Sequence, residues 1–382
     1  LLYSTEGREA APRYHSFLQK ESLRAVSFSS ALCNATSSDV SYASIFTGLS
    51  PEESDLRFHT NPLIWSIAHA KGYRTSLYSS QTMKWCNMEA FLLDETLDRF
   101  CSCEVLKAPI FNDLSMDDYD LNPIIIAELT KEEKPFCAVV NYNMLHYPYF
   151  DGKSKLPTSE AEARERYLSA LRKFDTCLGN LLDSLEKSGK LENTAVFFTG
   201  DHGELPEKSF PIMNRPIHMR LNDFNSDVVR IPFWIRLPVN ATSRENLSRL
   251  RANSNTIVSN VDIYPTLMHL LGWDSVLQTK LSSGQSLFDP IRKDRNSIVL
   301  NTGVLREWKY EPFAVGRDGW LFIYHDVIQK IELIRMDDPK KKDVWKTTPE
   351  SVRAAWLGDI CKIQALSDIL SRWKGAFPKK GS

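Results

Sequence analysis

The stretch that decides the fold is Thr194-Ala-Val-Phe-Phe198 followed by Thr199-Gly-Asp-His-Gly-Glu204. Its first half is a short run of β-branched and aromatic residues, which predicts a buried strand. Buried parallel strands in α/β proteins present their chemistry just beyond their carboxyl ends. There, Asp201 and His202 offer a carboxylate oxygen and an imidazole nitrogen, both of which bind divalent metals. An ordinary strand-to-loop turn contains the same residue types, so this stretch alone supports both interpretations.

Outward from this stretch, predicted strands and helices alternate along the chain. The alternation predicts βαβ units and a central, mainly parallel sheet flanked by helices, which is an α/β fold. The longest predicted helix covers residues 161–188, where leucine and aromatic residues recur at steps of three and four. A shorter helix is predicted at 61–71, and strands at 1–4, 73–78, 136–142 and 195–199.

The last quarter of the chain has a different pattern. Short extended segments at 297–300, 312–315, 320–324 and 330–334 are separated by turn signals such as Arg317-Asp-Gly319. This pattern predicts a small antiparallel sheet. We therefore expect a catalytic domain over residues 1–290 and a C-terminal antiparallel subdomain over 291–382, packed on the first.

The composition limits the class of protein. Lys plus Arg is 47 and Asp plus Glu is 48, for a formal net charge of −1. A general nucleic-acid binder would carry a basic excess, so we expect no nucleic-acid partner. The apolar runs are strand-sized and too short to span a membrane. Because the sequence starts at Leu1 inside a predicted strand and without Met, we expect a trimmed N-terminal segment, either a signal peptide or a membrane anchor.

The cysteine pattern adds one expectation. The chain has seven cysteines and no Cys-x-x-Cys pair, which argues against a zinc knuckle or a thioredoxin-like site. Cys86, Cys101 and Cys103 are close enough in sequence to form a disulfide in an oxidising compartment.

A second polar cluster runs from Asn34 to Gly48 and is dense in hydroxyl groups. It leads into a predicted helical segment, Ala43-Ser-Ile-Phe46. A serine at such a helix start lies where backbone N–H groups and the helix dipole favour a phosphate or sulfate. A serine or threonine that only caps the helix would give the same pattern.

The stretch Ser38-Asp-Val-Ser-Tyr-Ala-Ser-Ile-Phe-Thr-Gly48 resembles the nucleophile motif of the sulfatase-like branch of the alkaline phosphatase superfamily. In that branch the nucleophile lies nine positions before a Thr-Gly pair, which points to Ser38, and a serine follows three positions later, here Ser41. Other motifs agree in order over about residues 1 to 335. These are Tyr3-Ser-Thr-Glu-Gly7, Asn141-Tyr-Asn-Met-Leu-His-Tyr-Pro-Tyr149, the Asp-His-Gly-Glu run, Arg230-Ile-Pro-Phe-Trp-Ile-Arg236 and Val258-Ser-Asn-Val-Asp-Ile-Tyr-Pro-Thr-Leu267.

The resemblance implies a set of site residues. The metal ligands would be Glu6, Ser38, Asp201 and His202, with Ser38 as nucleophile and Ser41 as a substrate contact. His146 and His218 would bind phosphate oxygens or protonate the leaving group. Thr36 and Ser37 stay as alternative nucleophiles.

Departures from the main sulfatase pattern indicate the branch. Main-type sulfatases have Cys-x-Pro-x-Arg, whereas the corresponding residues here are Ser38, Val40 and Tyr42. A lone N-terminal glutamate with a hydroxyl nucleophile is similar to the phosphoethanolamine and phosphoglycerol transferases, including lipoteichoic acid synthase. Those enzymes more often use threonine as the nucleophile, which keeps the two alternatives open.

These features predict a metal-dependent phosphotransferase or phosphodiesterase that transfers a phosphoethanolamine- or phosphoglycerol-type group through a covalent serine (or threonine) intermediate. The expected substrate is a phosphodiester lipid or glycan. We expect one divalent ion, zinc first and otherwise Mn, Mg or Ca. We also expect an extracytoplasmic, monomeric domain. The alternatives are a divergent serine-type sulfatase and a catalytically silent binding protein.

Overall fold

A computed structural model describes residues 1–110, 115–149, 157–206, 224–238, 241–301, 312–326 and 328–373. The helices are α1 (Thr5–Ala10), α2 (Pro12–Lys20), α3 (Ser38–Thr47), α4 (Asp55–Thr60), α5 (Ile64–His69), α6 (Met88–Leu92), α7 (Cys103–Leu106), α8 (Asp118–Lys131), α9 (Glu160–Lys187), α11 (Ser226–Val229), α12 (Ala241–Asn253), α13 (Ile263–Leu270), α14 (Ser275–Leu281), α15 (Glu350–Ile360) and α16 (Gln364–Leu370). The strands are β1 (Ala25–Ser27), β2 (Ser30–Leu32), β3 (Arg74–Ser79), β4 (Arg99–Ser102), β5 (Phe136–Asn141), β6 (Val196–Thr199), β7 (Phe233–Arg236), β8 (Ile257–Ser259), β9 (Ser297–Leu300), β10 (Phe313–Arg317), β11 (Trp320–His325) and β12 (Lys330–Arg335).

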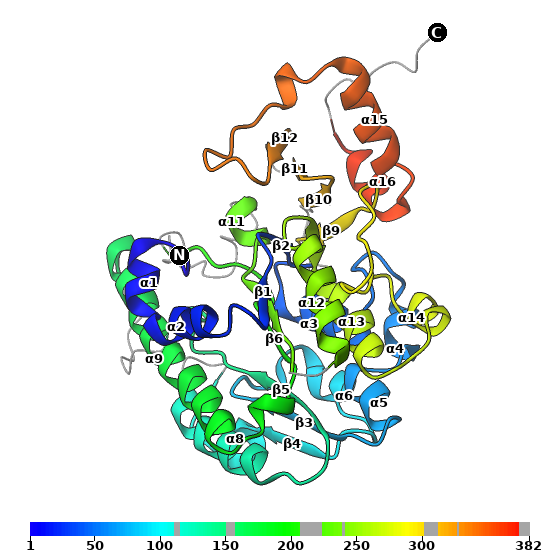
Figure 1. Cartoon of the computed structure of the whole chain (residues 1–382). Helices are drawn as coiled ribbons and strands as arrows, with labels where there is room; N and C mark the ends of the chain where they lie inside the picture. The colour runs from blue at the N-terminus through cyan, green and yellow to red at the C-terminus, as the bar shows by residue number, and fades with distance from the viewer. Residues whose placement is uncertain are drawn as a thin grey trace.

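The main body is a layered α/β structure in which helices flank short sheets (Figure 1). Strand β3 pairs in parallel with both β4 and β5, and β2 pairs in parallel with β8. Strand β7 instead runs antiparallel to β1 and β6. The predicted α/β class is confirmed, with the parallel pairing concentrated around β3.

The long helix α9 forms one wall of this body. Its leucine stripe and Phe174 pack in one apolar cluster with Trp234 of β7 and with residues of α8. Ser159 caps the helix, since its side chain accepts a hydrogen bond from the backbone N–H of Glu162. The helix predicted at 161–188 therefore matches the structure closely.

The C-terminal sheet has the order β12-β11-β10-β9, and every pair in it is antiparallel. Its side chains alternate between two apolar clusters, as a period of two requires. Val299 and Ile323 face the main core, whereas Ile298 and Phe322 face α15 and α16. The sheet therefore lies between the main body and these two helices (Figure 1).

The strand predicted at residues 1–4 is wrong. The backbone turns there, with the Ser4 N–H donating to the Leu1 carbonyl at 2.8 Å, and α1 follows immediately. The Ser4 side chain caps this helix by accepting from the Gly7 N–H at 3.1 Å. Glu6 consequently lies in the first turn of a helix and not at the end of a strand.

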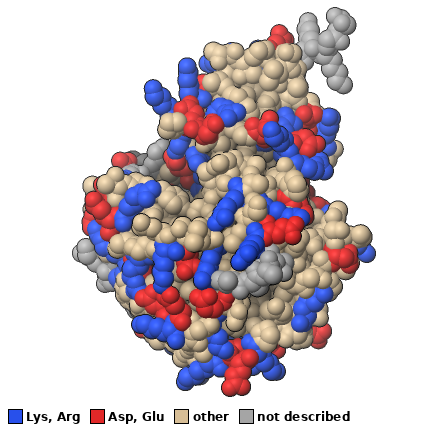
Figure 2. Space-filling view, in the orientation of Figure 1, with Lys and Arg blue, Asp and Glu red and all other residues tan. Residues whose placement is uncertain are grey.

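Three further observations concern the cysteines, the surface charges and the apolar content of the helices. All seven cysteines are free thiols, so the disulfide that the spacing of Cys86, Cys101 and Cys103 permits is not formed. Basic and acidic side chains are interspersed on the face shown in Figure 2, in keeping with the balanced composition. Among the described helices, none combines the length and the apolar content needed to cross a bilayer.

Candidate active site

The loop after β6 is held by its own backbone and by Asn260. The Asn260 amide accepts from the Thr199 hydroxyl at 2.7 Å and donates to the Gly200 carbonyl at 2.9 Å. The Gly203 N–H donates to the Val228 carbonyl at 2.7 Å. A Cβ atom at Gly203 would lie 2.2 Å from a backbone oxygen, so only glycine allows the loop to pass this close to α11. Asp201 and His202 are thus fixed at the carboxyl end of β6.

Ser38 is the first residue of α3, where the helix dipole and the backbone N–H groups favour an anion. The opposite end of this helix closes on Gly48, which has a left-handed φ of 69° and packs against the Tyr264 ring. Ser37 precedes the helix but makes no side-chain cap to it. The predicted helical segment Ala43–Phe46 lies within α3, which starts five residues earlier than predicted and so places the Ser38 hydroxyl at the anion-favouring end.

Ser38 and His202 meet in the folded chain. The Ser38 Oγ lies 3.4 Å from His202 Nε2, and Nε2 lies 3.4 Å from Asp201 Oδ2. His202 Nδ1 is 2.8 Å from the Gly203 carbonyl oxygen. Because a carbonyl only accepts, Nδ1 donates this hydrogen bond, and in the neutral imidazole the lone pair then lies on Nε2. The imidazole therefore presents an acceptor to the serine hydroxyl or to a metal ion.

The neighbouring hydroxyl groups make other contacts. Thr36 donates its hydroxyl to the Oδ1 atom of Asn301, and Ser37 donates to Asp39 Oδ1 at 2.5 Å. Of the three candidate nucleophiles, Ser38 is the one whose Oγ faces His202. This geometry favours Ser38 over Thr36 and Ser37.

Two residues of α3 have roles different from those the resemblance implied. Ser41 is fully buried and donates its hydroxyl to the Asp201 carbonyl at 2.5 Å. The hydroxyl was expected to contact substrate, but in the structure it fixes the loop after β6. Tyr42, at the position of the family arginine, donates to Gln81 at 2.8 Å. Burial, with the charge of Asp201 second, raises the pKa of the Tyr42 hydroxyl well above its usual range. Tyr42 is therefore neutral and cannot replace the arginine charge.

The structure does not bring Glu6 to the other predicted ligands. Its carboxylate is half exposed and forms an ion pair with Arg164 of α9. His146 follows β5, and its Nδ1 donates to the Tyr147 carbonyl at 2.6 Å. His218 lies outside the described residues.

Ser38, Asp201 and His202 suit a divalent ion by their chemistry. Tetrahedral zinc bonds of about 2.0–2.1 Å place neighbouring ligand atoms about 3.3 Å apart. The two separations of 3.4 Å among these three side chains agree with that value. Within the described residues, no group of three or more His, Cys, Asp or Glu side chains has a metal-binding arrangement. These residues therefore supply part of a ligand set.

Asp118 supports the segment that carries His146, and no sequence signal pointed to it. Its Oδ2 accepts from the Met144 N–H at 2.8 Å, and its Oδ1 from the Asn143 N–H at 3.3 Å. The side chain is completely buried, and burial raises the pKa of its carboxyl to about 7. An acidic residue at a helix start resembles a helix-dipole residue, so the sequence did not separate this role from that one.

The raised pKa of Asp118 predicts a pH-dependent stability. An unfolded aspartate has a pKa of about 3.9, so the folded state holds this proton more tightly. Its stabilising contribution is fully present below about pH 4 and is lost as the pH rises through about 7. Between pH 5 and 8 the wild-type protein should lose about 2 to 3 kcal/mol of unfolding free energy relative to Asp118→Asn. Urea unfolding of both proteins at several pH values measures this, and parallel pH profiles would contradict it.

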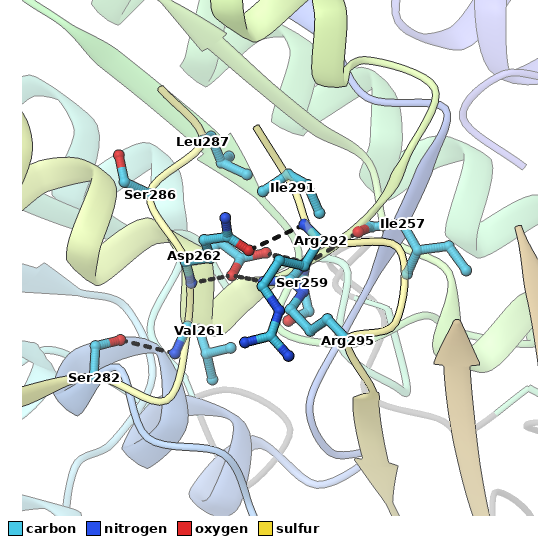
Figure 3. Close-up of polar contacts among 12 residues, drawn as sticks. Ile257, Ser259, Val261, Asp262, Ser282, Ser286, Leu287, Ile291, Arg292 and Arg295 are labelled. Atoms are coloured by element: carbon cyan, nitrogen blue, oxygen red, sulfur yellow. Dashed lines mark hydrogen bonds and ion pairs between the residues drawn. The ribbon is translucent and has the colours of Figure 1, made fainter. Parts of the chain in front are cut away.

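A buried ion pair between Asp262 and Arg295 supports the turn that carries Asn260. The Asp262 carboxylate receives both Nη atoms of Arg295, at 2.5 and 2.8 Å, and the Ser259 N–H at 2.8 Å. Figure 3 shows the carboxylate between these groups. The Gln285 N–H adds a further hydrogen bond at 2.9 Å. This pair fixes the turn that carries Asn260 and, through it, the end of β6.

Relatives of the chain include lipoteichoic acid synthases and a sulfatase. Lipoteichoic acid synthase 1 of Bacillus subtilis (strain 168) is 26% identical over 179 residues, which covers 46% of this chain and 26% of that protein. The ulvan-active sulfatase of Formosa agariphila is 26% identical over 291 residues, covering 67% of this chain and 52% of that protein. The chain thus spans about half or less of the length of these relatives.

Solved structures agree on the fold. A protein of the alkaline phosphatase superfamily from Vibrio parahaemolyticus matches with a TM-score of 0.61 and 18% identity, covering 96% of this chain and 81% of that one. The C-terminal periplasmic domain of EptC from Escherichia coli, a complex with Zn, matches with a TM-score of 0.58 and 16% identity, covering 80% of this chain and 86% of that one.

The Sulfatase family model matches residues 8–273, well over half of the chain. That span contains the Ser38 loop, the β6 loop and the Asp262 turn, so the match covers the parts that build the site. The chain belongs to the Sulfatase family.

Proposed function

We propose that this protein is a metal-dependent phosphotransferase or phosphodiesterase that transfers a phosphoethanolamine- or phosphoglycerol-type group through a covalent Ser38 intermediate. The observation that carries the proposal is the Ser38 hydroxyl at the start of α3, 3.4 Å from the acceptor nitrogen of His202. A hydroxyl nucleophile is weak at its own pKa and needs an activating partner, which would be a divalent ion held by this histidine beside it. The similarity to lipoteichoic acid synthase supports transfer as the reaction.

The reaction has two displacements. The Ser38 hydroxyl releases its proton to water as its oxygen forms a bond to phosphorus, and the bond from phosphorus to the first alcohol breaks. A protonated histidine, His146 or His218, gives its proton to the leaving alkoxide. That histidine then takes the proton of an acceptor hydroxyl or water, which attacks the phosphoserine. The bond to Ser38 breaks, and the Ser38 oxygen regains a proton from water. The amino end of α3 stabilises the phosphate charge in both steps.

The proposal includes one divalent ion, zinc first and otherwise Mn, Mg or Ca. Asp201, His202 and the Ser38 oxygen would hold it, and the EptC domain solved in complex with Zn supports zinc. When bound, such an ion lowers the pKa of a ligating hydroxyl and polarises phosphoryl oxygens. A second carboxylate was expected from Glu6, which pairs with Arg164 in this structure.

The remaining proposals concern the setting of the reaction. The substrate would be a phosphodiester-containing lipid or glycan, and the domain would work as a monomer on the outer side of a membrane, with no nucleic-acid partner. The periplasmic EptC domain and the lipoteichoic acid synthases support the location.

A second candidate is sulfate-ester hydrolysis by a serine-type site. The ulvan-active sulfatase, which aligns with two thirds of this chain, favours it. Both reactions would use Ser38, so the residues near it do not separate them. A catalytically silent role is less consistent with the way Ser38, Asp201 and His202 meet.

Side-by-side assays separate these functions. The protein is incubated with bis-p-nitrophenyl phosphate, p-nitrophenyl phosphate and p-nitrophenyl sulfate, and its intact mass is followed with phosphatidylethanolamine and phosphatidylglycerol. Preferred turnover of the phosphodiester, with an added phosphoethanolamine or phosphoglycerol mass mapped to Ser38, would support the transferase. Preferred turnover of the sulfate would favour the sulfatase, and no turnover with any of them would overturn both.

Metal removal gives a further prediction. Dialysis against EDTA should lower phosphodiester turnover at least about 100-fold, and one equivalent of Zn²⁺ should restore it. His202→Ala should lower the bound zinc measured by elemental analysis, because it removes an imidazole ligand. As a matched control, His325→Ala changes a histidine that pairs with Glu332 of the C-terminal sheet, and it should keep full metal content. Unchanged activity after chelation would contradict the metal dependence.

A further inference from the structure

The nucleophile loop and the C-terminal sheet are joined by hydrogen bonds. The Leu300 N–H donates to the Asn34 carbonyl at 3.0 Å, and the Thr36 N–H donates to the Leu300 carbonyl at 3.1 Å. Ala35 and Leu300 form a parallel bridge. Residues 34–36 therefore extend the four-stranded sheet next to its edge strand β9.

Two side chains reinforce this junction. The Asn34 amide donates to the Ile298 carbonyl at 3.3 Å and accepts from the Val261 N–H at 3.1 Å. The Thr36 hydroxyl donates to Asn301 Oδ1, in a contact between residues that are 265 positions apart. Asn34, Thr36 and Asn301 are at most 4% exposed. Such buried polar groups are costly unless they are paired, so this pairing defines one position for the loop.

Thr36, which makes the contact with Asn301, lies two residues before Ser38 in the sequence. Asn301 Nδ2 is also buried, and within the described residues it has no hydrogen-bond partner. Because the Asn301 amide is inaccessible, it cannot contact a substrate. It can affect the reaction only by holding the loop that carries Ser38. A small displacement of the loop would move the Ser38 oxygen away from His202, and misplacement of a reacting group by about 1 Å can lower a rate about 100-fold.

We infer that Thr36 and Asn301 are positioning residues. Through their contact, the C-terminal sheet holds the Ser38 oxygen in its position beside His202. This inference rests on the proposed function, because it assigns to the pair the alignment of Ser38. It also gives Thr36 a role other than that of an alternative nucleophile.

The experiment compares Thr36→Val, Thr36→Ser, Asn301→Ala, Asn301→Asp and the Thr36→Val/Asn301→Ala double variant. Thr36→Val removes the hydroxyl with little change in shape, whereas Thr36→Ser keeps it, and Asn301→Asp keeps an acceptor oxygen. Thr75→Val is the matched control, because Thr75 is fully buried at the start of β3 and donates its hydroxyl to the Thr96 carbonyl.

With bis-p-nitrophenyl phosphate, Thr36→Val and Asn301→Ala should lower kcat about 10- to 100-fold while KM changes less than about twofold. Thr36→Ser should restore most of kcat, and Asn301→Asp should retain more activity than Asn301→Ala. The double variant should be no worse than the poorer single variant, because both remove one contact. Additive losses, or a loss equal to the decrease in folded protein seen with Thr75→Val, would overturn the inference.

Hydrogen exchange provides a readout that does not depend on activity. Amides of residues 34–38 should exchange at least about tenfold faster in Thr36→Val and Asn301→Ala, and at the wild-type rate in Thr75→Val. Unchanged exchange in all variants would overturn the inference. If the wild-type protein turns over no substrate but the exchange result holds, the proposed function fails while the positioning of the loop stands.

Discussion

Replacing Ser38 by alanine is expected to lower phosphodiester turnover by about 10⁴-fold or more, since the side chain that forms the covalent bond is removed. The variant should fold normally and should still bind metal through Asp201 and His202. The intact-mass shift seen with a lipid donor should disappear. Steady-state kinetics and mass spectrometry on the same preparations measure both effects.

Ser44→Ala is the matched control for this variant. Ser44 lies in the same helix, is fully buried, and its hydroxyl has no hydrogen-bond partner within the described residues. Alanine is a better helix former than serine, so this variant should keep the wild-type rate and equal or higher stability. Wild-type turnover by Ser38→Ala would rule out Ser38 as the nucleophile and direct attention to Ser37.

Asp262→Ala is expected to destabilise the protein by about 3 to 5 kcal/mol, which is the usual cost of breaking a buried ion pair by removing one partner. Asp262 is completely buried, and the Arg295 side chain is only 14% exposed. The variant would leave the guanidinium without its partner and two backbone N–H groups, those of Ser259 and Gln285, without their acceptor. Urea unfolding at neutral pH, monitored by tryptophan fluorescence, measures the loss.

Asp289→Ala gives the comparison for a surface pair. Asp289 lies 3.7 Å from Arg249, and both side chains are more than 40% exposed, so the loss there should be at most about 1 kcal/mol. The loss of unfolding free energy in Asp262→Asn should be intermediate between those of Asp262→Ala and Asp289→Ala, because asparagine keeps an acceptor oxygen but removes the charge. Equal losses for the two alanine variants would show that the Asp262 pair adds no more than a surface contact.

Local patterns were enough to predict much of the architecture. The spacing of apolar residues placed α9, and the strand predicted at 297–300 coincides with β9. The Arg317-Asp-Gly319 turn also forms, with positive φ at Asp318 and Gly319. These elements depend on residues close together in the sequence, and single-sequence patterns carry that information.

Contacts between distant segments were harder to predict. The start of the chain was a local error: its apolar residues suggested a strand, but a serine cap at Ser4 and the close approach of Gly7 to the Leu1 carbonyl favour a turn and a helix. The hydroxyls of Ser41 and Thr36 looked like active-site groups, yet their partners are Asp201 and Asn301. No local pattern reports a partner so far away in sequence, and this also explains why Asp118 and Asn260 were missed.

The junction between residues 34–36 and strand β9 has a consequence for biosynthesis. A ribosome completes the Ser38 loop early, but the strand that holds it is made more than two hundred residues later. Until then the loop lacks its long-range partners, and contacts of such sequence separation form slowly. The reactive hydroxyl would therefore come into alignment only after β9 and Asn301 have been made, so a shorter nascent chain would carry the serine without its activity.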